Sequence, residues 1–360
     1  MSKLLLTIQR MQLLLICRGY RTTSTAALQV LAGIPPLDLQ AERESLLARV
    51  LRLDENATLW NQNYYHTDYE KHKPVLLGHP ADIDLSDSIQ LVYASSKKNS
   101  FSLYTDGSKT ERGAGSAFCA LQGETIIKTW KRRLDIRNTV FQTEVAALKA
   151  AIKFAVYSLR FRATIFSDSA SSLAAIRGNK SRSSYVQELK KILLHCPPSL
   201  RPHLVWVPAH VGITGNEKAD ELAKSAANDK SLREYPVKLP TSYLKRSTLE
   251  NLLCQWQERW DSAPTGRRTY SFFPKVGTVA KVTNGAQTHF FSGHGPFPTY
   301  LKRFHLSGTE FCECGEVGDP RSLSLPLCIH QTLSPEENQV IYFGHNGQKQ
   351  SARIVLLNAN

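Results

Sequence analysis

The spacing of hydrophobic residues divides the chain into helical or irregular flanks and a central region where strands and helices alternate. Four apolar residues near the N-terminus recur at helical spacing, and polar residues separate them, so an amphipathic helix is predicted there. They are Leu4, Ile8, Met11 and Leu15. A signal or transit peptide over the basic stretch 1–21 is the alternative. A second helix is predicted over Leu39–Leu53, after the break at Pro35 and Pro36.

From residue 100 the pattern becomes β-β-β-α-β-α-α-β-α. The first strand begins at Phe101, ends on Asp106 and breaks at Gly107, and Gln122-Gly123 marks a hairpin turn between the next two. The other predicted strands are 113–120, 125–132, 163–168 and 203–207. The predicted helices follow Thr139 and cover 169–177, 184–194 and 214–227. This order predicts an α/β fold with a mixed five-stranded sheet, three antiparallel strands then parallel ones, and helices on both faces.

Two of these helices begin with the signature of a capping box. Thr139 and Gln142 have the spacing in which the hydroxyl accepts from the third helical amide and the Gln side chain reaches back. Thr214 and Glu217 have the same spacing. We therefore expect both Thr139 and Thr214 to be N-cap residues.

Four carboxylates lie at related places in this pattern. Asp106 and Asp168 end strands that should reach the same sheet edge, and Glu144 lies in the apolar stripe of the helix after Thr139. Asp220 follows Asn216 by one helical turn. Each residue alone has an ordinary structural interpretation, as a turn, cap or solvated residue. Converging carboxylates repel one another without a cation, so together they predict a site for a pair of Mg²⁺ ions and phosphoryl chemistry.

Residues 98–228 resemble type 1 ribonuclease H. Four motifs carry the resemblance in order: Thr105-Asp-Gly-Ser108, Gln142-Thr-Glu144-Val-Ala-Ala-Leu148, Phe166-Ser-Asp168-Ser and Val207-Pro-Ala-His210-Val-Gly-Ile-Thr-Gly-Asn216-Glu-Lys-Ala-Asp220. The resemblance implies a ribonuclease H-like fold in which Asp106, Glu144, Asp168 and Asp220 bind two Mg²⁺ ions, with Mn²⁺ as a substitute. It also implies that His210, on a mobile loop, assists proton transfer or product release.

The implied substrate is the RNA strand of an RNA–DNA hybrid, whose 2′-hydroxyls lie on one strand only. Some members of the family carry an extra basic helix, and here only the short stretch 177–182 occupies that place. Candidate substrate contacts are Ser108, Lys109, Asn138, Asn216, Arg177 and Lys180. For the basic residues, Lys109, Arg177, Lys180 and Arg182, the alternative to phosphate contacts is a solvated basic loop.

The flanks resemble segments of Jockey-like non-LTR retrotransposon polyproteins. Tyr20–Thr25 and Leu31–Leu37 are similar to the region after the reverse transcriptase, and Trp256–Trp260 and Gly293–Leu301 to the region after the ribonuclease H. No Asp-Asp pair occurs, so we expect a C-terminal fragment of a retroelement polyprotein that lacks the polymerase, or a host gene model built over such a fragment. The predicted organisation is a helical segment at 1–55, a linker at 56–96, a ribonuclease H domain at 97–229, a C-terminal retroelement segment with a Cys/His cluster at 230–330, and an unassigned tail at 331–360.

A zinc site in the C-terminal segment has weaker support. Cys312, Cys314, Cys328 and His330 supply suitable ligand types, but the related element has a His before its third Cys where this chain has only Ser and Leu. Unliganded thiols are therefore preferred over zinc. The chain contains seven Cys, an odd number, which favours a reducing, intracellular compartment, nucleus or cytoplasm.

The net charge of the chain indicates which class of binding partner to expect. The formal net charge is +14, which favours nucleic acid over a membrane surface, and no apolar run is long enough to predict a membrane span. The leading hypothesis is a Mg²⁺-dependent endonuclease acting on RNA–DNA hybrids. The alternatives are a catalytically idle nucleic-acid-binding remnant of a retroelement, and another nuclease of the same superfold, such as an integrase. No oligomeric state is predicted.

Overall fold

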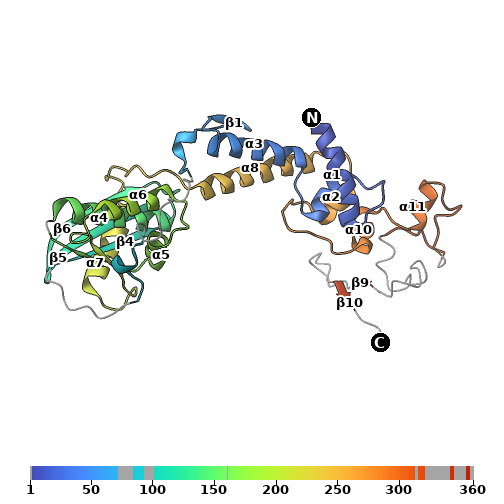
Figure 1. The fold of residues 1–360 in the computed structure, drawn as a ribbon. Coiled ribbons are helices and arrows are strands. Elements are labelled where there is room, and N and C mark those ends of the chain that lie inside the picture. The colour runs from blue at the N-terminus through green and yellow to red at the C-terminus, as the bar shows by residue number, and fades with distance from the viewer. Residues whose placement is uncertain are drawn as a thin grey trace. The chain divides into compact units, whose positions relative to one another are not determined.

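The computed structural model describes residues 2–71, 84–92, 101–159, 161–312, 315–320, 341–343 and 354–356. It separates into two compact units, one formed by residues 1–45 and 248–360 and the other by residues 46–247. Figure 1 shows the elements of both. Helices α3 (Leu37–Leu51) and α8 (Thr241–Asp261) contribute residues to each unit.

The sheet of the second unit contains the predicted strands in the predicted order. It is formed by β4 (Phe101–Lys109), β5 (Ala114–Gln122), β6 (Thr125–Leu134), β7 (Thr164–Ser167) and β8 (His203–Trp206). Strands β4, β5 and β6 pair antiparallel, and β7 and β8 continue parallel to β4. The predicted α/β class with helices on both faces is confirmed.

A sixth strand, β3 (Ile89–Gln90), pairs with β8 in parallel and was not predicted. Two residues are too short to show alternation of polar and apolar positions. The segment interpreted as a linker also contains a hairpin of β1 (Ala57–Leu59) and β2 (Gln62–Tyr64), the short helix η1 (His66–Asp68), and η3 (Ser86–Ser88) before β3. Its remaining residues lie outside the described ranges.

Alternate side chains of the strands pack against different helices. Leu103 faces the larger core, built with α4 (Val140–Ser158), α5 (Ala170–Arg177) and α6 (Ser184–His195). Tyr104 faces α7 (Thr214–Asn228). In Figure 1 α4 and α6 run along the sheet. The sheet is thereby covered on both faces, as the sequence pattern predicted.

Helix α7 approaches the sheet closely because small residues line its inner face. Ala219, Ala223, Ala226 and Ala227 are fully or almost fully buried. A β-carbon at Gly115 of β5 would overlap the carbonyl oxygen of Ala223, so only glycine fits there. This close packing holds the part of α7 that carries Asn216 and Asp220 against β4 and β5.

One of the two predicted capping boxes is present. The Thr139 hydroxyl accepts a hydrogen bond from the Gln142 amide at 3.2 Å, and the Gln142 side chain accepts one from the Thr139 amide at 3.3 Å. The prediction for Thr214 was wrong. Thr214 is already the first residue of α7, so Ile213 is the N-cap, and the Glu217 amide donates to the Ile213 carbonyl at 3.0 Å.

The described residues of the first unit are mostly helical. Its elements are α1 (Ser2–Cys17), α2 (Thr25–Ala32), most of α3 and α8, α9 (Arg267–Phe272), α10 (Gly285–Ser292) and α11 (Pro298–Arg303), with β9 (Ile341–Phe343) and β10 (Ile354–Leu356) paired antiparallel.

Helix α1 buries a different face from the predicted one. Leu4, Met11 and Leu15 are 64%, 68% and 78% exposed, whereas Gln9, Leu13 and Cys17 are buried.

Hydrogen bonds explain why α1 buries the polar residue Gln9 on its inner face instead of the predicted apolar residues. The Gln9 amide donates to the Pro35 carbonyl at 2.7 Å, and its oxygen accepts from the Gln29 side chain at 2.8 Å. Burial of Gln9 therefore leaves no polar atom unpaired. Leu13 and Cys17, on the same face, join a core with Leu28 and Leu31 of α2.

Candidate active site

The strand register brings two of the predicted carboxylates together. The last registered pair between β4 and β7 is Thr105 with Ser167, and the residues that follow them in the chain are Asp106, still on β4, and Asp168, just after β7. Glu144 joins them from the second turn of α4. Ligand oxygens of Asp106, Glu144 and Asp168 all lie within 4.8 Å of one another. Three parts of the chain that are distant in sequence thus converge at the C-terminal end of β7, beside the central strand β4.

Two features fix the position of Glu144: the capping box at the start of α4 and the glycine at position 107 of β4. The capping box fixes the first turn of α4, and Glu144 follows it, 7% exposed. A β-carbon on Gly107 would lie 2.6 Å from the carbonyl carbon of Thr143 and would overlap the amide of Glu144. The residue after Asp106 must therefore be glycine for α4 to approach β4 this closely.

Asn216 contacts the carboxylate of Asp168. Its side-chain amide donates to Asp168 Oδ2 at 3.2 Å, and the residue is 3% exposed. Asn216 was predicted as a substrate contact. In this structure it orients Asp168, and its own side-chain oxygen is buried without a hydrogen-bond partner.

Asp220 lies at the border of this group. Lys224, one turn further along α7, forms an ion pair with its Oδ2 at 2.6 Å. Among the described residues Asp220 does not belong to the three-carboxylate group, but its charge still raises the pKa of Asp106. Lys224 was not predicted as a site residue, although its spacing of four residues from Asp220 is a signal that the sequence contains.

Burial and mutual repulsion disfavour ionisation of the inner carboxylates. Burial, followed by the charges of Asp168 and Asp220, raises the pKa of Asp106 to about 7. Burial, followed by the charges of Asp106 and Asp168, raises the pKa of Glu144 well above its usual value. Glu144 Oε2 is buried without a hydrogen-bond partner. These oxygens suit a divalent cation. It would offset the repulsion between the carboxylates and would give the unpaired Glu144 Oε2 a partner.

His210 lies outside the carboxylate group, on the turn between β8 and α7. It is exposed and has a left-handed backbone with φ 55°, and Gly212 two residues later has φ 81°. No contact holds its imidazole within the described part of the chain. The side chain is therefore free to reorient in solvent.

The remaining predicted substrate contacts differ in accessibility. Ser108 is half-buried, whereas Arg177 and Lys180 are exposed. The Lys109 ammonium donates to the Asn138 carbonyl at 2.7 Å. Asn138 is fully buried, and its amide donates to Gln142 Oε1 at 3.0 Å and the Lys238 carbonyl at 3.2 Å. Asn138 therefore shapes the loop before α4 rather than offering its amide to a ligand.

The predicted Cys/His cluster is only partly described. Cys312 is a half-buried free thiol, and its amide donates to the Glu316 carbonyl at 2.7 Å. Cys314, Cys328 and His330 lie outside the described residues.

Comparison with known proteins agrees with this geometry. Residues 98–228 match the family model described as RNase H. The chain is 27% identical over 154 residues to a retrovirus-related Pol polyprotein from type-1 retrotransposable element R1 of Popillia japonica. It is 35% identical over 81 residues to a protein of the same description from Bradysia coprophila.

These alignments cover only part of each protein. The first includes 42% of this chain and 61% of the Popillia protein, and the second 21% of this chain and 8% of the Bradysia protein. The chain therefore matches less than two thirds of either relative. Among the described residues no helix combines the length and the apolar character needed to cross a membrane.

Proposed function

Residues 98–228 form a ribonuclease H domain of the kind found in non-LTR retrotransposon polyproteins, and from this premise we propose that the chain is an endonuclease that hydrolyses the RNA strand of RNA–DNA hybrids with two Mg²⁺ ions. The observation that carries the proposal is the convergence of Asp106, Glu144 and Asp168 within 4.8 Å. Such a group of hard oxygen donors suits Mg²⁺ better than a softer metal.

Each residue of the group has a distinct part in the proposal. Asp106, Glu144 and Asp168 would hold the cations, and Asp220 would add a fourth carboxylate once its ion pair with Lys224 rearranges. Asn216 keeps the Asp168 carboxylate in one orientation through its 3.2 Å hydrogen bond. Bound there, Mg²⁺ ions would supply an activated water and would stabilise the charge on the scissile phosphate.

His210 would move protons or help the product leave. This role is supported by its exposed position on the turn before α7, where the imidazole is accessible from solvent. The formal net charge of +14 supports binding of a polyanion, and exposed Arg177 and Lys180 are candidates for phosphate contacts. The natural hybrid would be met inside the cell, in the nucleus or the cytoplasm.

A cleavage assay tests the proposal. Full-length protein is incubated with a hybrid labelled on its RNA strand, in Mg²⁺, Mn²⁺, Ca²⁺ or EDTA, with labelled single-stranded RNA and DNA duplex as controls. We expect internal cuts in the RNA of the hybrid with Mg²⁺ or Mn²⁺. Ca²⁺ should fail because its larger, looser coordination shell misplaces the attacking water. Equal cleavage in EDTA would refute the proposal, and binding without cleavage would favour the idle remnant.

A further inference from the structure

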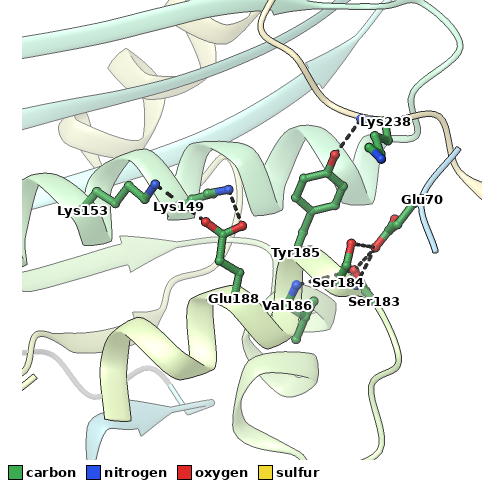
Figure 2. A network of polar contacts seen from close by, with 9 residues as sticks. All are labelled: Glu70, Lys149, Lys153, Ser183, Ser184, Tyr185, Val186, Glu188 and Lys238. Atoms are coloured by element: carbon green, nitrogen blue, oxygen red, sulfur yellow. Dashed lines mark hydrogen bonds and ion pairs between the residues drawn. The ribbon is translucent and has the colours of Figure 1, made fainter. Parts of the chain in front are cut away.

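We propose that Glu70, which lies outside the ribonuclease H match at 98–228, is a positioning residue that holds the first turn of α4 and thereby keeps Glu144 aligned with Asp106 and Asp168. The inference rests on the proposed function. Glu70 belongs to the segment before the sheet, yet its carboxylate contacts the N-terminal ends of two helices of the domain, α4 and α6. Figure 2 shows the contacts with Ser183 and Ser184 at the start of α6.

One carboxylate oxygen of Glu70 caps the N-terminus of α6. Glu70 Oε1 accepts hydrogen bonds from the Ser184 amide at 2.8 Å and from the Ser183 hydroxyl at 2.5 Å. Ser183 is the N-cap of α6, and its hydroxyl accepts from the Val186 amide. A negative charge at a helix N-terminus is also favoured by the helix dipole. Glu70 is therefore fixed to α6 by directional contacts.

The other oxygen reaches α4. Glu70 Oε2 accepts from the Gln142 side-chain amide at 3.1 Å. The carbonyl end of the same Gln142 side chain accepts from the Thr139 amide at 3.3 Å and from the Asn138 side chain at 3.0 Å. Gln142 is thus the reciprocal partner of the N-cap Thr139 in the capping box of α4, and Glu70 binds the other end of its side chain. Glu144 follows only two residues later.

The backbone around Glu70 is anchored by the segment that follows the domain. The Glu70 amide donates to the Leu239 carbonyl at 2.8 Å, and the Leu239 amide donates to the Asp68 carbonyl at 2.8 Å. The adjacent Lys238 amide donates to the Tyr185 hydroxyl at 2.6 Å (Figure 2). The Lys238 carbonyl accepts from Gln142 Nε2 at 3.0 Å. Residues on both sides of the family match therefore support the start of α4.

A small movement of α4 has a large effect on the carboxylate group. Glu144 is buried, and the backbone beside it abuts Gly107, so the side chain cannot compensate freely for a shift of its helix. Loss of Glu70 would leave the Ser184 amide without its acceptor and would release one of the two partners of Gln142 Nε2. Metal sites and reacting groups tolerate only small displacements, and about 1 Å can cost about 100-fold in rate.

The test uses the full-length chain and four variants. These are Glu70→Ala, Glu70→Gln, the reciprocal exchange Glu70→Gln with Gln142→Glu, and the control Glu55→Ala. Glu55 pairs with Arg49 at the surface of the same flank, its side chain 52% exposed. Mn²⁺ affinity is measured by calorimetry without nucleic acid. The kcat and KM values for hybrid cleavage are measured well below the melting temperature.

For Glu70→Ala we expect Mn²⁺ affinity and kcat to fall about ten-fold and KM to change less than about two-fold, because hybrid contacts remain while the carboxylates move. Glu70→Gln should also lose kcat, since its amide and that of Gln142 are both donors. The reciprocal exchange restores a donor and an acceptor, so it should recover part of kcat. The control should match the wild type.

Unchanged kcat and Mn²⁺ affinity in Glu70→Ala, even with a lower melting temperature, would reduce Glu70 to a structural cap and overturn the proposal. Failure of the reciprocal exchange to improve on Glu70→Gln would also count against it. If Glu70→Ala does not fold, Glu70→Gln is judged by the same criteria. Absence of cleavage by the wild type would refute the nuclease function instead, and the Mn²⁺ affinities would still decide the role of Glu70.

Discussion

The backbone amide of Glu144 occupies the place where a β-carbon on residue 107 would lie. Strand β4 and helix α4 can meet at this point because Gly107 has no side chain. Two neighbouring residues in the sequence therefore serve the same site in different ways. Asp106 supplies a carboxylate, and Gly107 admits the helix that supplies another.

Gly107→Ala should lower both stability and cleavage. The added methyl group must push α4 away from β4, and overpacking of this kind costs about 1–3 kcal/mol of unfolding free energy. The displacement would also move Glu144, so cleavage by the folded fraction should fall at least about ten-fold. Urea unfolding and hybrid cleavage are the measurements. Gly277→Ala is the control because a β-carbon added at Gly277 would meet no atom within 4 Å, and it should change neither quantity.

Asp168→Asn should abolish hybrid cleavage while leaving the fold and hybrid binding largely intact. Asn keeps the shape and one oxygen, which can still accept the hydrogen bond from Asn216, but it removes a full charge from the cation site. Loss of such electrostatic stabilisation is commonly worth several orders of magnitude in rate. Asp229→Asn, at the surface beyond α7, serves as the control. Wild-type cleavage by Asp168→Asn in Mg²⁺ would refute the assignment.

Stability of the metal-free protein should decrease as the pH rises from about 5 to 8. The pKa of Asp106 is about 7 in the folded protein and near 3.9 when unfolded, so folding favours its protonated form. The resulting stabilisation is complete below the unfolded pKa and is lost as the pH rises through the folded pKa. The raised pKa of Glu144 acts in the same direction. Urea unfolding in EDTA measures the effect.

Two comparisons make the pH prediction specific. Asp106→Asn should flatten the dependence, because the residue no longer titrates. Saturating Mg²⁺ should reverse it, since the cation binds the ionised carboxylates and gains affinity as protons leave. A metal-free stability that rises with pH over this range would mean that the carboxylates ionise without penalty in the fold.

The order of the strands and helices could be predicted from the sequence. Each element of 98–228 has a clear spacing of apolar residues and is bounded by turn or cap residues. The group of Asp106, Glu144 and Asp168 was also predicted, since strand ends and helix faces are readable from spacing. Burial of Gln9 was not, because its partners at residues 29 and 35 come from tertiary contacts. The same holds for Glu70, which is a single polar residue in a segment without periodicity.

Hybrid binding should weaken steeply with salt. Neutralising phosphates releases condensed counterions, so the logarithm of the association constant should fall linearly with the logarithm of salt concentration. Arg177→Ala combined with Lys180→Ala should lower the slope if these exposed side chains contact phosphates. Affinity is measured for a hybrid in Ca²⁺ between about 50 and 200 mM salt. A flat response would show that the basic residues lie away from the nucleic acid.

A fragment of residues 46–247 should melt at a higher temperature than one of residues 97–229. Both contain the whole predicted domain, and we expect both to unfold cooperatively. Only the longer fragment keeps the bonds from Glu70 to Ser184 and Gln142 and from Leu239 to Asp68. Calorimetry of the two fragments provides the comparison. Equal melting temperatures would mean that the flanking segments add no stability.

Strand β6 ends the sheet on one side, and its composition bears on self-association. An edge strand presents unpaired amides and carbonyls to which a second copy of the chain can add a strand. Lys128, Lys131, Arg132 and Arg133 place four positive charges on β6, and Glu234 pairs through its backbone with one end of it. Two such edges would repel each other. Ile126 and Ile127 of β6 are exposed. Repulsion between the edges would keep them from nucleating aggregates, and high salt would weaken that protection.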